Sequence, residues 1–312
     1  EKLPEPSTGR DIFRLSIKER LIFHSVIAFN KLTGRWNYPA IASGDLETMK
    51  KIDLIYWFYK AAAPHTRAVK NSGLEAFFEN QKAFRYSTPV QFSAKDELTL
   101  SAVGDLMDHP YLANSSEDIY REVADTIFGA DVSMGNLECV VYTDAKPFVF
   151  KLPESPPLVY TEKTFNVVKG FQNRKYTFLA TANNHSLDCG EAGVDCTIRM
   201  LKNEAIAFHG MNETEKDAEI ATVVNKKGFK LGLISHTFGL NAKKPPKEKP
   251  WIINRTHLLG KLHEVDFSRI ERQIRYCHEN KVDAVIAHLH WGMEHELYPR
   301  PEQIEIAHYL SE

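Results

Sequence analysis

Hydrophobic residues near the start of the chain recur at the three- and four-residue steps of an amphipathic helix. Within residues 11–31 these positions are Ile12, Leu15, Ile17, Leu21, Ile22 and Val26. They predict a helix with one apolar face. A second helix is predicted over residues 45–62, because Asp45 stands at its start and Glu47 and Thr48 fall in its first turn. We therefore interpret residues 1–96 as a mainly helical N-terminal extension that packs on the rest of the protein, the alternative being a segment that binds a membrane surface or a partner.

From residue 97 onward, short apolar runs alternate with helical patterns. The runs that predict strands are 98–104, 130–136, 177–183, 219–225, 230–236 and 282–290. Helices are predicted over residues 117–128, 191–203, 266–280 and 301–311. The turn signal Lys226-Lys227-Gly228 pairs the fourth run with the fifth. This order of strands and helices predicts an α/β fold with a mainly internal sheet.

Composition agrees with a folded chain and separates its two parts. The 312 residues are 43% hydrophobic and 11% aromatic, which excludes a disordered or fibrous protein. The net charge of -2 argues against a dedicated nucleic-acid binder. It is the sum of 15 Lys and Arg against 10 Asp and Glu in residues 1–96, and 24 against 31 in residues 97–312. The first part also holds 14 of the 34 aromatic residues, so we divide the chain into domains 1–96 and 97–312.

The cysteine pattern and the hydropathy exclude two further classes of protein. The four cysteines contain no CxxC pair, which excludes a zinc finger or a disulfide scaffold. Cys189 and Cys196 remain either bridged or reduced. No apolar run approaches the roughly 18–20 residues of a membrane span.

Polar residues of one chemical kind follow four of the predicted strands. Ligand sites in α/β proteins form beyond the carboxyl ends of the strands, so we expect these side chains to converge. Their carboxylate, amide and imidazole groups suit zinc, manganese or iron, and together they predict a site for a divalent metal. Taken singly, each has a simpler interpretation as a turn cap, a core histidine or a polar sheet end. The residues are Asp105 after the first strand, Asn136 and Glu138 after the second, Asn183, Asn184 and His185 after the third, and His288 and His290 at the last.

Five stretches of sequence together resemble the CapA family of poly-γ-glutamate capsule-synthesis proteins. They are GDLM (104–107), GNLE (135–138), ANNHSLDCGEAG (182–193), HTFGLN (236–241) and HWGMEHELYPRPEQ (290–303). That family has a calcineurin-like metallophosphoesterase fold. The resemblance therefore implies a metallophosphoesterase-like α/β sandwich over residues 97–312, whereas residues 1–96 resemble no family that we can name.

The resemblance also implies a role for each polar residue. One or two divalent ions (Mn, Zn or Fe) are expected to activate a water for attack on the substrate. His185 is expected to protonate the leaving group, and Asp188, three residues later, to orient it. The implied metal ligands are Asp105, Glu138, Asn184 and His290, with Asn136 in support and His288 as a further candidate.

Two departures from the family pattern bear on this site. The Asp-x-His that opens many metallophosphoesterases is absent, because Leu106 and Met107 follow Asp105. The family also continues past the last predicted helix into another strand and a histidine-rich block. We therefore expect the C-terminal part of the domain to be missing after Glu312.

These features lead to two hypotheses about function. The first is a bacterial metal-dependent hydrolase that acts on a phosphoester or on an anionic polymer such as poly-γ-glutamate. The alternative is a non-catalytic polymer-binding or scaffold subunit of a membrane-associated poly-γ-glutamate synthase. Both imply a place at the membrane or cell surface, although the sequence itself contains no anchor, and neither involves nucleic acid.

Overall fold

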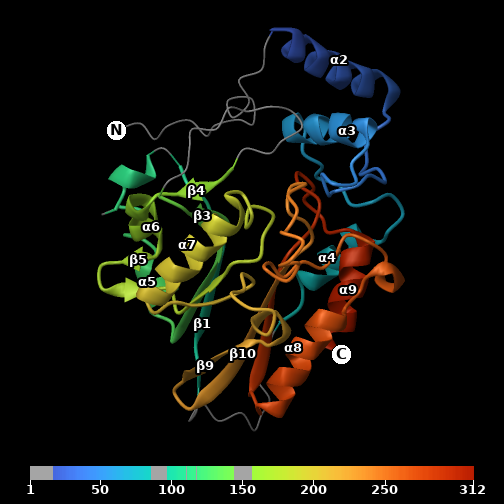
Figure 1. The fold of residues 1–312 in the computed structure, drawn as a ribbon. Coiled ribbons are helices and arrows are strands. Elements are labelled where there is room, and N and C mark those ends of the chain that lie inside the picture. The colour runs from blue at the N-terminus through green and yellow to red at the C-terminus, as the bar shows by residue number, and fades with distance from the viewer. Residues whose placement is uncertain (1–16, 86–96, 110, 117, 144–156) are drawn as a thin grey trace. The chain divides into compact units, whose positions relative to one another are not determined.

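The computed structural model describes residues 17–85, 97–109, 111–116, 118–143 and 157–312 (Figure 1). These form two compact units. The first contains the described parts of residues 1–90 together with 258–263 and 292–312. The second contains the described parts of residues 91–257 together with 264–291.

The first unit is helical. It contains α2 (Ile17–Thr33), α3 (Lys51–Ala62), α4 (Leu74–Gln81) and α9 (Pro301–Ser311). The predicted helix over 11–31 corresponds to α2, and residues 11–16 lie outside the described residues. The second predicted helix starts six residues late, at Lys51, because the Asp45 carboxylate accepts a hydrogen bond from the backbone N–H of Glu47 at 3.0 Å and closes a separate turn. The core of the unit is aromatic, with Trp36 packed against Tyr56 and Tyr59.

The second unit contains two sheets. The first has the strand order β1-β2-β7-β8 and is parallel throughout. Its strands are β1 (Leu100–Leu106), β2 (Val132–Leu137), β7 (Phe178–Ala180) and β8 (Ala207–His209). The second sheet has the order β11-β10-β9, in which β10 (Phe229–Thr237) is parallel to β11 (Ala284–His290) and antiparallel to β9 (Thr222–Lys226).

The two sheets pack face to face, with helices on their outer faces (Figure 1). Alternate residues fill the space between them, including Met134 of β2, Phe178 of β7 and Leu233 of β10. Leu179 faces the other way, into a core shared with α5 (Ala124–Phe128) and α6 (Glu162–Val168). Ile234 packs against Cys277 of α8 (Ser268–Glu279). The α/β fold predicted from the sequence is confirmed, and the structure adds that the first sheet is parallel.

Smaller elements connect the sheets and helices. The helix α7 (Gly190–Asn203) contacts the short strand β3 (Val140–Val141), which pairs with β4 (Val159–Tyr160). A hairpin is formed by β5 (Gly170–Phe171) and β6 (Arg174–Lys175). Short 3-10 turns span Leu112–Asn114, Asp217–Glu219 and Leu262–Glu264.

Most of the predicted elements are found. The helix predicted over 117–128 is limited to α5, because residues 118–123 form successive turns, and residue 117 lies outside the described residues. The helices α4 and α6 were not predicted. The strands β3, β4, β5, β6 and β8 were not predicted either, since their two or three residues are too few for an alternating pattern to be visible. All four cysteines are free thiols, so Cys189 and Cys196 are not bridged. Among the helices that the structure describes, none combines the length and the apolar character needed to cross a bilayer.

Candidate metal site

The parallel strands bring polar side chains to one edge of the second unit. Asp105 lies at the end of β1 and pairs in register with Asn136 of β2. The register shifts between Ala102 and Asp105, which is the kind of irregularity that re-aims a side chain. The backbone N–H of Glu138 donates to the carbonyl of Leu106 at 3.1 Å, so Glu138 remains beside the end of β1.

His290 reaches the same edge from the second sheet. It is the last residue of β11, where it pairs with Thr237 of β10. Side chains alternate along a strand, so His288 and His290 share a face with Ile286, which packs between the two sheets. The ring of Phe238 stacks on that of His290, with 6.3 Å between centroids and 14° between planes.

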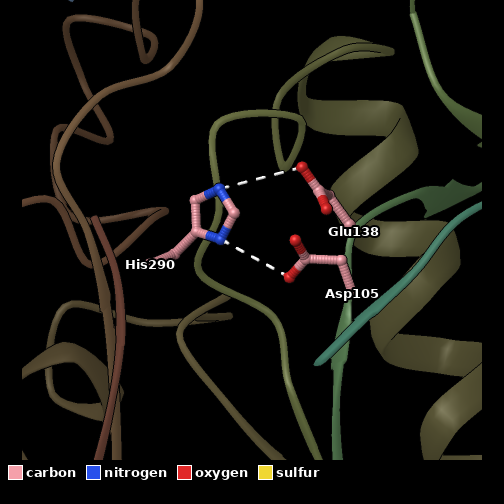
Figure 2. Close-up of side chains that lie close together, drawn as sticks. All are labelled: Asp105, Glu138 and His290. Carbon is pink, nitrogen blue, oxygen red and sulfur yellow. Dashed lines mark ion pairs between the residues drawn. The ribbon is translucent and has the colours of Figure 1, made fainter. Parts of the chain in front are cut away.

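Asp105, Glu138 and His290 form a group with the spacing of metal ligands (Figure 2). His290 Nδ1 lies 3.8 Å from Asp105 Oδ1, and His290 Nε2 lies 3.7 Å from Glu138 Oε1. One ligand atom of each residue lies within 4.8 Å of the others. Ligand atoms about 2.1 Å from a tetrahedral ion stand about 3.4 Å apart, and a spacing within 4.8 Å is close to that of ligands around one ion. Within the described residues, this is the one such group of three.

The protonation states of the group suit a cation. Burial lowers the pKa of His290 to about 4, so its imidazole is neutral at pH 7 and has a lone pair to offer. Burial by itself raises the pKa of Asp105, but the hydrogen bond from Asn136, the contact with Glu138 and the nearby histidines bring it below its usual value. The side chains of Glu138 and His290 are 9% and 16% exposed, whereas that of Asp105 is 49% exposed. The group is thus buried on one side and open to solvent on the other.

Asparagines hold this group in place. Asn136 Nδ2 donates to Asp105 Oδ1 at 2.7 Å and lies 3.2 Å from His290 Nδ1. Asn136 Oδ1 accepts from Asn183 Nδ2 at 3.2 Å, and the same nitrogen donates to the carbonyl of Leu137 at 2.7 Å. Asn136 therefore turns its amide nitrogen, rather than its oxygen, toward the group and orients Asp105.

Asn184, His185 and Asp188 lie beside the group. Asn184 Oδ1 accepts from His290 Nε2 at 2.9 Å. His185 Nδ1 donates to Asp188 Oδ2 at 2.7 Å, and the backbone N–H of Leu158 donates to the same oxygen at 2.7 Å. The Asp188 side chain is completely buried, so it holds the His185 ring from behind.

His288 lies outside the group of three. Its Nδ1 is buried and has no hydrogen-bond partner among the described residues. Burial lowers its pKa, and the Asp105 carboxylate opposes that shift. The structure thus brings Asp105, Asn136, Glu138, Asn184 and His290 together, with His185 and Asp188 adjacent.

Asn183 was named from the sequence as a strand-end residue but given no role, and Asn241 was not assigned. Asn183 lies three residues beyond the end of β7. Asn241 lies four residues beyond the end of β10 and contacts both Asn184 and His185. It falls in the HTFGLN stretch but follows no strand end, and contact with the group is visible only in three dimensions.

Fold and site together define an α/β protein with a candidate metal site at the carboxyl ends of its parallel strands. Residues 99–312 match the family model described as bacterial capsule synthesis protein PGA_cap, and the chain belongs to that family. The predicted resemblance to CapA is confirmed. The matched region begins at residue 99, two residues after the start of the predicted domain 97–312.

Individual proteins of similar sequence share about a quarter of the aligned residues with this chain. The chain is 24% identical over 241 residues to the PGA biosynthesis protein CapA of Bacillus subtilis. The aligned region covers 74% of this chain and 58% of that protein. Two proteins of Sinorhizobium fredii, described only as uncharacterized, are each 26% identical over 157 residues, or 50% of this chain and 34% of theirs. The chain thus spans between about a third and three fifths of the length of these relatives.

Proposed function

We propose that this member of the capsule-synthesis family is a metal-dependent hydrolase that cleaves a phosphoester or a bond in an anionic polymer. The proposal rests on one observation, the convergence of Asp105, Glu138 and His290 from three separate strand ends. The family match and the two packed sheets with outer helices support a metallophosphoesterase-like fold for the second unit. The Bacillus subtilis relative, PGA biosynthesis protein CapA, supports poly-γ-glutamate as the polymer.

The donor set fits a divalent cation. Asp105, Glu138 and His290 would hold it, and Asn184 offers its Oδ1 at 2.9 Å from His290 Nε2. A bound zinc, manganese or iron ion would supply Lewis-acid activation of a water and of the substrate. Carboxylate and imidazole ligands suit these three metals.

His185 is placed to move a proton. Its Nδ1 is committed to Asp188, so Nε2 is the nitrogen that exchanges a proton with the leaving group. The buried Asp188 carboxylate stabilises the ring when it carries a positive charge, as in other carboxylate–histidine pairs. Asn136 positions Asp105, Asn183 holds Asn136, and neither exchanges a proton.

The experiment is metal analysis of the purified chain, followed by hydrolysis of bis-p-nitrophenyl phosphate with and without manganese. We expect about one or two ions per chain and turnover that requires the metal. His185→Gln should lower turnover and leave the bound metal in place. A chain without bound metal refutes the proposal, and bound metal without turnover on phosphodiesters or on poly-γ-glutamate favours a non-catalytic polymer-binding subunit instead.

A further inference from the structure

A chain of amide contacts connects His290 to His185. Asn184 Oδ1 accepts from His290 Nε2 at 2.9 Å, and Asn184 Nδ2 donates to Asn241 Oδ1 at 3.2 Å. Asn241 Nδ2 then lies 3.4 Å from His185 Nε2. Because Asn184 occupies the oxygen of Asn241, only the Asn241 amide nitrogen is directed at His185. The metal group and the proton-transferring ring are therefore joined through two side-chain amides.

The backbone around Asn241 is held in a costly conformation. Asn241 and Ala242 have φ values of 50° and 62°, and the N–H of Lys243 donates to the carbonyl of Leu240 at 2.8 Å. This is a tight turn with two consecutive left-handed residues, a conformation that asparagine tolerates and alanine disfavours. Strained conformations of this kind persist where the surrounding structure requires them. Here the turn carries the Asn241 side chain to His185.

We propose that Asn241 is a positioning residue that fixes the His185 ring relative to the metal group, an inference that rests on the proposed hydrolase function. Asp188 holds the ring at Nδ1, and a single hydrogen bond still allows it to swing. Asn241 supplies the second contact, at Nε2, in the neutral ring whose Nε2 carries no proton, and the plane of that ring is set by the two contacts together. Since Asn184 holds Asn241 and also contacts His290, the ring is aligned with the group that would hold the cation.

The test removes the side chain and keeps the backbone conformation. Asn241→Gly deletes the amide, and glycine adopts a positive φ without strain. Asn71→Gly is the matched control, since Asn71 is an exposed asparagine with φ of 64° in the first unit. At saturating manganese we expect Asn241→Gly to lower kcat about 10- to 100-fold with little change in KM, and Asn71→Gly to leave both unchanged.

A second measurement needs no turnover. Nitrogen-15 NMR of histidine-labelled, zinc-supplemented protein reports each ring nitrogen of His185, with the signals assigned by their loss in His185→Gln. In Asn241→Gly we expect the Nε2 signal to move while the Nδ1 signal, held by Asp188, stays in place. A merely structural defect would move both signals or broaden the spectrum generally.

The two measurements separate the positioning role from the proposed hydrolase. An unchanged Nε2 signal, or an unchanged kcat in a protein that does turn over, overturns the role of Asn241. If the unsubstituted chain hydrolyses nothing, the hydrolase proposal fails, and the NMR comparison alone decides whether Asn241 holds the ring.

Discussion

Replacement of Glu296 by glutamine tests a buried electrostatic network in the first unit. Glu296 Oε1 lies 2.8 Å from Lys60 Nζ of α3 and 2.7 Å from Arg300 Nη2. Its Oε2 accepts from Arg300 Nε at 2.6 Å. The side chains of Glu296, Lys60 and Arg300 are 1%, 3% and 13% exposed, so one buried carboxylate balances two cations. Glu296→Gln keeps the shape and removes the charge.

The expected cost follows from distance and burial. Two unit charges 2.8 Å apart attract by about 6 kcal/mol at an effective dielectric constant of about 20, before the cost of desolvation. Removal of one partner from a buried pair generally costs about 3–5 kcal/mol, because the other charge stays buried without compensation. The pKa of Lys60 reflects both effects, because burial lowers it and the Glu296 carboxylate opposes that shift. We expect Glu296→Gln to destabilise the first unit by about 3–5 kcal/mol.

Hydrogen exchange measured by mass spectrometry resolves this effect by segment. Peptides from α3 and α9 should exchange about 10²- to 10⁴-fold faster in Glu296→Gln, because each 1.4 kcal/mol is about a factor of ten. Peptides from α7, in the second unit, serve as the internal reference. Glu305→Gln, an exposed substitution on α9, should change exchange by less than about threefold. Equal exchange in the two variants would refute the assignment of a stabilising role to this buried network.

Three further predictions concern the second unit. Asp105→Asn should remove divalent metal measured by elemental analysis, whereas His185→Gln should retain it, and equal loss in both would contradict the division between ligand and proton donor. Gly210→Ala should cost about 2–4 kcal/mol in urea unfolding, because φ is +120° and a Cβ would lie 2.4 Å from the Ala182 backbone nitrogen. Gly228→Ala, with φ of +86° and nothing within 4 Å, should cost about 1 kcal/mol, and equal losses would refute the clash. Burial lowers the pKa of His209 from 6.5 to about 4. About 3 kcal/mol of unfolding free energy, present above pH 6.5, should therefore be lost as the pH falls to about 4. His209→Gln should flatten this dependence of stability on pH.

The positions of the site residues could be predicted because strand ends are visible in the sequence. An apolar run that stops at a polar residue shows where a strand ends, and parallel strands end at a common edge. Asp105, Asn136 and His290 were placed in this way, and the structure brings them together. The inference required no distances, only the direction of the strands.

The links between these residues could not be predicted. Asn241 reaches His185 from a turn whose left-handed residues leave no periodic signal. The orientation of Asn136 depends on the amide of Asn183, a neighbour from a different strand end. Such details are set by packing between segments distant in sequence, and alternation along a single strand carries no information about them.

The longest of the five stretches that resemble the family contains one residue of the candidate site and several residues that stabilise the chain. Of the stretch HWGMEHELYPRPEQ, only His290 belongs to the candidate metal site. Glu296 and Arg300 form the buried network with Lys60, and Gln303 accepts a hydrogen bond from the backbone N–H of Arg300 at 2.8 Å at the start of α9. A shared motif of this kind therefore identifies a fold more firmly than a reaction, because most of its residues stabilise the chain. The metal and NMR measurements on Asp105, His185 and Asn241 address the few side chains on which the reaction would depend.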